Sequence, residues 1–188
     1  PLRFLTRKNL RDLVIGLSLL STIAFSMGIG TIIFGFVVLA LGCFLHVVSK
    51  GVLIRDVVLC DKGIYSLVRH PYYLANYLID VSFCLLSGNI FLVLAYPFLF
   101  FWAYGPTIRK EEKVLLAGHH DSFMRDSMEI PQVFPDRSSV QNLRSFFIGF
   151  SFHRVTLKEC ARIMKFVGTG TLLLFIHQAK LDGFNGDF

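Results

Sequence analysis

Charged residues divide the chain into polar segments and two long apolar runs. No charged residue occurs from Leu13 to Leu45, a run of 33 residues, or from Val81 to Ile108, a run of 28 residues. A membrane-spanning helix needs about 20 predominantly apolar residues. Because both runs exceed that length, the pattern predicts an all-α integral membrane protein. A soluble bundle with two very long buried helices is the alternative that this pattern disfavours.

Each run has turn residues near its middle, which indicates a hairpin of two helices instead of one long helix. The first run is interrupted by Gly-Ile-Gly at 28–30 and the second by Gly-Asn at 88–89. Glycine and asparagine are common turn residues. Pro71 suits the first turn of a helix, where its missing N–H is not needed. We therefore expect two transmembrane helical hairpins, over residues 13–48 and 72–107.

The positive charges support the hairpins and orient them. Lysines and arginines occur before, between and after the two runs, whereas the two turn sequences carry no charge. Cytoplasmic loops of membrane proteins are enriched in these residues. With two hairpins all charged loops lie on one side, which we expect to be the cytosolic face. The cations are Arg3, Arg7, Lys8 and Arg11, then Lys50, Arg55, Lys62 and Arg69, then Arg109, Lys110 and Lys113.

The C-terminal extension, residues 136–188, contains a further uncharged stretch. Residues 166–179 carry no charge and lie between two lysines. Such a stretch predicts either a fifth membrane helix, with lysine side chains extending to the interface, or a helix lying at the interface. We expect a fifth C-terminal helix. Residues 1–188 are then one polytopic membrane domain.

Composition gives no reason to expect a nucleic-acid partner or a metal. The net charge of +6 is explained by juxtamembrane cations that meet anionic lipid headgroups. The pair His119-His120 has no further ligand at a helical spacing, so we expect no metal site. The cysteines are scattered without a C-x-x-C or zinc pattern, which indicates free thiols; they are Cys43, Cys60, Cys84 and Cys160.

Two charged segments stand at the predicted membrane edges. Arg69 and His70 precede the third helix, and Glu111 and Glu112 follow the fourth. Either segment alone is explained as a solvated or lipid-contacting helix end. A hairpin, however, returns the end of the fourth helix to the start of the third. Ionisable groups that converge at a membrane boundary indicate a functional site.

A ligand with both an amine and a carboxylate would suit such a site. Glutamates bind amines and ribose hydroxyls, and arginine, histidine or N–H groups at a helix start bind carboxylates. S-adenosylmethionine has all these groups, although the chemistry alone does not single it out.

The two segments resemble the paired motifs of the membrane methyltransferases, which include isoprenylcysteine carboxyl methyltransferase and the phospholipid N-methyltransferases. The motif G-x-Y-x-x-x-R-H-P-x-Y is formed by Gly63, Tyr65, Arg69, His70, Pro71 and Tyr73. The motif R-x-E-E-x-x-L is formed by Arg109, Glu111, Glu112 and Leu115. A similar closing segment contains Gly118, Asp121, Phe123, Pro131 and Pro135, so the similarity spans roughly residues 38–135.

The resemblance implies an S-adenosyl-L-methionine-dependent methyltransferase whose methyl group faces a lipid-side tunnel. The bilayer and a lipid or lipidated acceptor are then its partners, and both a prenylated cysteine carboxylate and a phospholipid amine remain open as acceptors. The candidate catalytic residues are Arg69, His70 and Glu112. The cofactor contacts that the resemblance implies are Tyr65, Arg69, His70, Pro71, Tyr73, Glu111 and Glu112.

Two departures and two alternatives qualify the resemblance. Ala75 stands where the family commonly has glycine, and the chain continues beyond Pro135, where the family usually ends. An NADPH-dependent sterol-type reductase shares a similar R-H-P-x-Y segment, but its second segment usually lacks adjacent glutamates. The pair Glu111-Glu112 therefore favours the methyltransferase. A non-catalytic membrane scaffold of the same fold is the other alternative.

Overall fold

Five long helices make up most of the computed structural model, which describes residues 6–53, 62–118 and 129–185. The described residues form no strand. The long helices are α1 (Arg7–Ala24), α2 (Ile29–Val52), α3 (Pro71–Leu86), α4 (Ile90–Gly118) and α6 (Leu157–Asn185). Short 3-10 helices are η1 (Gly63–Ser66), η2 (Ser139–Ser145) and η3 (Phe152–Arg154).

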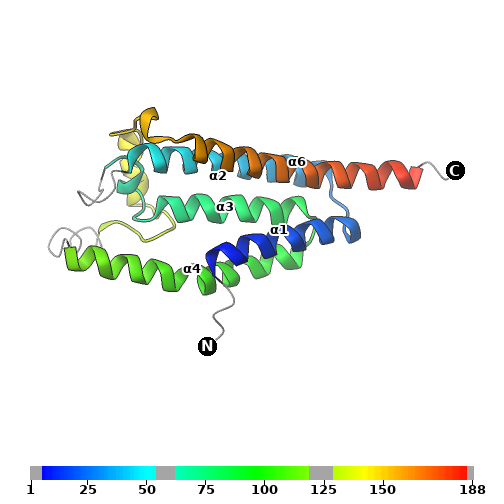
Figure 1. Cartoon of the computed structure of the whole chain (residues 1–188), viewed down its shortest axis with the longest axis horizontal. Coiled ribbons are helices and arrows are strands. Elements are labelled where there is room, and N and C mark those ends of the chain that lie inside the picture. The colour runs from blue at the N-terminus through cyan, green and yellow to red at the C-terminus, as the bar shows by residue number, and fades with distance from the viewer. Residues whose placement is uncertain (1–5, 54–61, 119–128, 186–188) are drawn as a thin grey trace.

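The two predicted hairpins are confirmed, with one shift in a turn. α1 and α2 form the first hairpin and α3 and α4 the second (Figure 1). The first turn lies at residues 25–28 instead of 28–30, because Gly28 caps α2 and Gly30 already belongs to that helix. The second turn contains Gly88, whose φ of 70° is a left-handed conformation that favours glycine.

Both turns lie at the same end of the molecule and contact each other. The side-chain amide of Asn89 donates to Ser21 Oγ at 3.0 Å. A Cβ atom on Gly88 would lie 3.0 Å from the carbonyl oxygen of Ser26, so only glycine allows this close approach. Figure 1 shows the turns at the right-hand end and the ends of α2 and α4 at the left. The described cations between and after the hairpins, such as Lys62, Arg69 and Arg109, therefore share the end opposite to the turns, whereas Arg3 and Arg55 lie outside the described residues.

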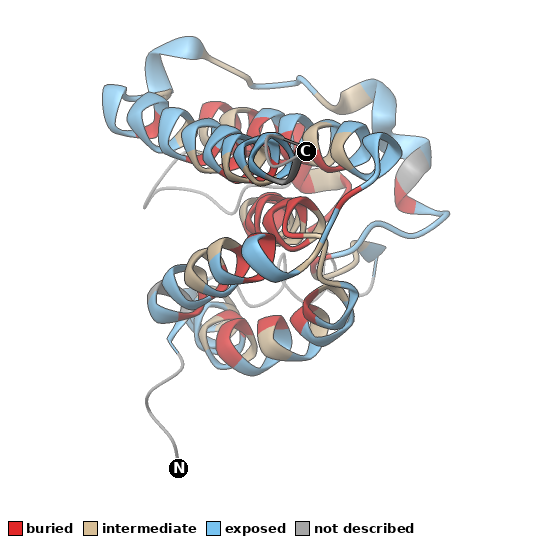
Figure 2. Cartoon of the chain, turned by 90° about the vertical axis from the view of Figure 1, so that its right-hand side faces the viewer, coloured by how far each residue is buried: buried red, intermediate tan, exposed pale blue. Residues whose placement is uncertain are grey.

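Helix α3 lies at the centre of the bundle and is largely buried (Figure 2). Its 16 residues span only about 24 Å at 1.5 Å per residue, less than the hydrocarbon core of about 30 Å. By length and composition, α2, α4 and α6 can each cross a membrane. α3 packs tightly on α2, since a Cβ atom on Gly42 would lie 2.8 Å from Ile79 Cγ1. Protein neighbours therefore surround this short helix.

The expected fifth helix is confirmed as α6, which is longer than the uncharged stretch that predicted it. It packs against α1, α2 and α3. A Cβ atom on Gly170 would lie 2.8 Å from Leu39 Cδ2, so this glycine allows α6 to approach α2 closely. Near the far end of α6, Lys180 Nζ donates to the carbonyl oxygen of Phe25 at 2.9 Å. The helix thus runs past the turn of the first hairpin.

Arg11, one of the cations that precede the first uncharged run, forms an ion pair inside the bundle. Arg11 lies within α1, and its Nε donates to Asp80 Oδ1 at 2.7 Å. Its Nη2 donates to Asn76 Oδ1 at 3.0 Å, and Tyr96 donates to Asp80 Oδ2 at 2.7 Å. The helix α1 begins at Arg7, before the uncharged run. Its first turns, which include Arg11, therefore pack within the bundle. The fully buried carboxylate of Asp80 gives Arg11 a partner there.

Candidate functional site at the start of α3

Arg69 and His70 stand directly before α3. Pro71 occupies the first turn of the helix, as the sequence predicts, and His70 is its N-cap. The N–H groups of Arg69 and His70 donate to the carbonyl oxygens of Pro131 and Gln132, both at 2.9 Å. These two N–H groups are therefore already hydrogen-bonded within the protein. An anion at this helix start would have to meet the side chains, aided by the positive end of the helix dipole.

Glu111 and Glu112 lie in the last turns of α4, and the hairpin brings them to Arg69 and His70, as expected. Arg69 Nη1 lies 2.9 Å from Glu112 Oε1. His70 Nε2 lies 3.4 Å from the same oxygen, and His70 Nδ1 lies 3.9 Å from Glu111 Oε2. Because α4 continues through Pro106 to Gly118, both carboxylates are held on a helix instead of a loop.

Two neutral side chains fix the carboxylates. The Tyr73 hydroxyl donates to Glu111 Oε1 at 2.6 Å, and Gln132 Nε2 donates to Glu112 Oε2 at 2.8 Å. The Tyr73 ring also packs edge-on against Tyr104, with 5.4 Å between centroids. Tyr73 was predicted from the sequence, whereas Gln132 and Tyr104 were not. Only the position of Gln132 beside Pro131, in the closing segment of the motif, pointed to it.

The site is partly buried, and its members differ in exposure. The side chain of His70 is 7% exposed, Arg69 17%, Glu112 18% and Glu111 47%. Burial lowers the pKa of His70 from its usual 6.5, and the nearby Glu112 and Glu111 only partly oppose this effect. The imidazole is therefore neutral at pH 7. Glu111 is the carboxylate most open to a ligand.

Tyr65 lies in η1 against α2. It is buried beside Leu45 and Val48, and its hydroxyl donates to the carbonyl oxygen of Ser49 at 3.4 Å. The structure therefore brings Arg69, His70 and Tyr73 together with both glutamates. The side chain of Tyr65 packs against α2.

Ala75, where the family commonly has glycine, packs at the α2–α3 contact and is fully buried. Other sequence candidates, His119, His120, Asp121 and Phe123, lie outside the described residues.

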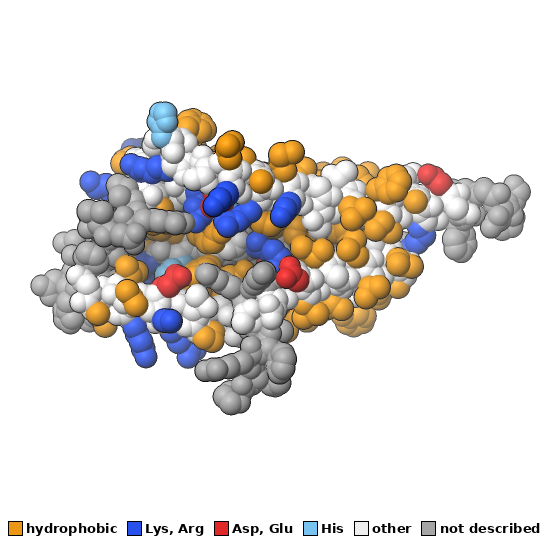
Figure 3. Space-filling model, viewed as in Figure 1, with side chains coloured by type: hydrophobic (Ala, Val, Ile, Leu, Met, Phe, Trp, Pro, Cys, Tyr) orange, Lys and Arg blue, Asp and Glu red, His pale blue; other side chains and the backbone are white. Residues whose placement is uncertain are grey.

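The end of the molecule that carries the site is basic. In Figure 3, Lys and Arg side chains gather over the left-hand half of the molecule, and hydrophobic side chains cover much of the rest. Exposed Phe, Leu and Ile side chains on α2 and α4, such as Phe34 and Phe98, form the apolar belt. This division of charge is typical of a membrane protein with one basic side.

The model of the isoprenylcysteine carboxyl methyltransferase (ICMT) family matches residues 23–117, just over half of the chain. The chain belongs to the ICMT family. No curated protein and no solved structure matches it. As a member of the ICMT family, it is a membrane methyltransferase of the isoprenylcysteine type. The match includes both charged segments of the site, whereas the NADPH reductase and the scaffold receive no support from it.

Proposed function

We propose that the protein transfers a methyl group from S-adenosylmethionine to the carboxylate of a lipidated acceptor, such as a prenylated cysteine. The observation that carries this proposal is the meeting of Arg69, His70, Glu111 and Glu112 at the basic membrane edge, within the segment that matches the ICMT family. We further propose that this edge is the cytosolic face, because it carries the loop cations.

The residues present fit S-adenosylmethionine. Glu111, the more exposed carboxylate, and Glu112 would bind its amine and ribose hydroxyls, and Arg69 and His70 would bind its carboxylate. The buried Nε2 atom of His70 contacts Glu112 Oε1 only at a long 3.4 Å, so a ligand group can replace this contact with a shorter hydrogen bond. Tyr73 and Pro71, with Tyr65 nearer α2, would form the apolar and aromatic wall.

When bound, the cofactor supplies an electrophilic methyl group, which an acceptor carboxylate oxygen takes while the sulfur keeps the electron pair of the broken C–S bond. The residues of the chain position the two reactants and exclude water, and proximity is the main source of the rate. A carboxylate acceptor needs no general base. This suits a site in which Tyr73 and Gln132 already hold Glu111 and Glu112 in fixed hydrogen bonds.

A calorimetric titration of the purified protein with S-adenosylhomocysteine and with NADPH tests the cofactor. We expect binding of the first ligand only, and binding of NADPH alone would contradict the proposal. Incubation with a labelled methyl donor and either a farnesylated cysteine or phosphatidylethanolamine tests the acceptor. Label that base treatment releases as methanol identifies a methyl ester, whereas base-stable label on the amine would show that the acceptor is an amine.

A further inference from the structure

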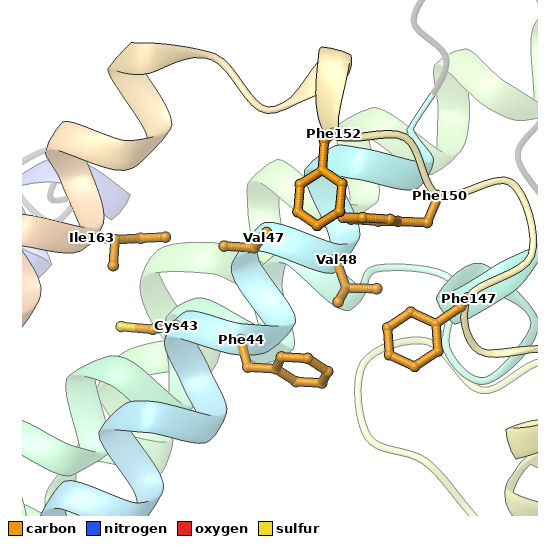
Figure 4. Close-up of a pocket in the computed structure, with 8 residues that line it drawn as sticks. All are labelled: Cys43, Phe44, Val47, Val48, Phe147, Phe150, Phe152 and Ile163. Atoms are coloured by element: carbon orange, nitrogen blue, oxygen red, sulfur yellow. The ribbon is translucent and has the colours of Figure 1, made fainter.

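A cavity of about 380 Å³ lies between α2, the start of α6 and the segment 147–152. Figure 4 shows the rings of Phe150 and Phe152 over Val47 and Val48, with Ile163 of α6 on the opposite side. Its lining is entirely apolar and contains no residue of the methyl-transfer site. The lining residues are Cys43, Phe44, Val47, Val48, Phe147, Phe150, Phe152 and Ile163.

The outer wall of this cavity is held in place by the backbone. The N–H of Ser151 donates to the carbonyl oxygen of Gly51 at 2.9 Å. Arg154 Nη1 donates to the carbonyl oxygens of Gly149 at 2.8 Å, Val52 at 3.1 Å and Gly51 at 3.2 Å. A side chain on Gly51 would collide with the Phe150 ring, so glycine there lets the segment lie flat on α2. The cavity is therefore preformed, as binding pockets usually are.

The mouth of the cavity opens to the outside of the helix bundle and is strongly apolar. Phe152 is 77% exposed, Phe147 58% and Phe44 46%. In a membrane protein such exposed rings at the end of a spanning helix lie in lipid. Next to them in the chain stand the exposed cations Arg154 and Lys158. An apolar cavity beside cations matches a molecule with a hydrocarbon chain and an anionic headgroup.

We propose that this cavity binds one acyl chain of an anionic phospholipid from the surrounding leaflet, with the phosphate beside Arg154 and Lys158. Its volume lies within the range of about 300–1,000 Å³ that is usual for small-molecule sites. Four of its lining residues, Phe147, Phe150, Phe152 and Ile163, come from beyond residue 117, where the family match ends. The C-terminal extension thus supplies half of the lining and α2 the other half, and the lipid site does not depend on the proposed methyl transfer.

The full chain, reconstituted in vesicles that contain phosphatidylglycerol with a photoactivatable group on one acyl chain, provides the test. After illumination we expect the cross-linked peptides to come mainly from residues 43–48 and 147–152. Val47→Trp places a large ring in the cavity and should lower the cross-linking yield at least about tenfold. The matched control is Val37→Trp, at a position on α2 that is 57% exposed and outside the cavity, which should leave the yield unchanged.

Three outcomes would overturn the proposal. An unchanged yield in Val47→Trp would show general lipid contact, as would equal labelling of the exposed face of α4. An equal yield with photoactivatable phosphatidylcholine would exclude selection of an anionic headgroup. An unchanged thermal unfolding temperature of Val47→Trp in detergent would confirm that this variant is folded.

Discussion

At the scale of single residues, the proposed function depends on how the two glutamates are held. The paired motifs are enough to predict that Arg69 and His70 meet Glu111 and Glu112, because the hairpin fixes their relative position. The hydrogen bond from Gln132 to Glu112 was not predictable. It depends on the path of the closing segment over the start of α3, and a sequence pattern does not specify a loop path.

Glu112→Gln should weaken binding of S-adenosylhomocysteine. Loss of a charge-assisted hydrogen bond to the ligand amine should cost about 1.5–3 kcal/mol, or roughly 10- to 100-fold in affinity. Glu111→Gln should have an effect in the same range if the two carboxylates share the ligand. Calorimetric titration measures both effects. Asp182→Asn, a change at an exposed acid near the opposite end, is the control, and unchanged affinity in both glutamate variants would make the pair a solvated helix face.

His70 should make the protein less stable in acid. Its folded-state pKa lies below the value of 6.5 because of burial, with Glu112 and Glu111 opposing the shift and Arg69 adding to it. Above pH 6.5 neither state binds the proton, so stability is unaffected there. As the pH falls through 6.5, the unfolded chain binds a proton that the folded site resists, and stability decreases. Thermal unfolding at about pH 8 and about pH 5 should show a smaller acid loss in His70→Gln than in the wild type. An equal loss would exclude this histidine as the cause.

At the scale of helices, the number and pairing of elements followed from the apolar runs, but one buried ion pair did not. The sequence shows Arg11 among terminal cations and Asp80 at the border of an uncharged run. Nothing in their spacing predicts that α1 packs Arg11 against α3. Only the tertiary packing of the short helix α3 brings the two side chains together. In the same way, the turn at residues 25–28 ends at Gly28, the first of the glycines that predicted it.

Asp80→Asn should destabilise the bundle by about 3–5 kcal/mol, because Arg11 would be left as a buried charge without its ionised partner. The double variant Arg11→Met with Asp80→Leu should recover most of that stability, since replacing a whole buried pair by apolar residues is often nearly neutral. Denaturant unfolding in detergent compares the variants. A double variant as unstable as Asp80→Asn would show that the charges themselves are required.

At the scale of the whole molecule, the hairpins place the site and the turns at opposite ends. The charge pattern of the loops was sufficient to predict this arrangement. The α6 helix is long and apolar enough to cross a membrane, and its C-terminal end lies toward the end that carries the turns, as Figure 1 shows. The cavity beside α6 was not predictable, because its lining comes from segments far apart in the chain.

Single cysteines should reveal the orientation of the protein in cells. In a background with Cys60 and Cys160 replaced by serine, Ser26→Cys lies in the first turn and Lys110→Cys at the opposite end, and both positions are exposed. An impermeant thiol reagent added outside should label Ser26→Cys but not Lys110→Cys, because cation-rich loops stay in the cytosol. Cys43 and Cys84 are buried and serve as internal controls. The reverse labelling pattern would invert the proposed orientation.

Transfer of a labelled methyl group to a farnesylated cysteine by the wild type and by Arg69→Lys tests the central claim most directly. Lysine keeps the positive charge that would serve a lipid phosphate but lacks the planar guanidinium that binds a carboxylate with two N–H groups. If Arg69 positions the reactants, Arg69→Lys should insert and fold normally but lower kcat/KM at least about tenfold, or roughly 1.4 kcal/mol of transition-state stabilisation. Arg144→Lys, a change at an exposed arginine of η2, should keep wild-type activity. Full activity in Arg69→Lys would contradict the account and leave Arg69 as a contact to lipid headgroups.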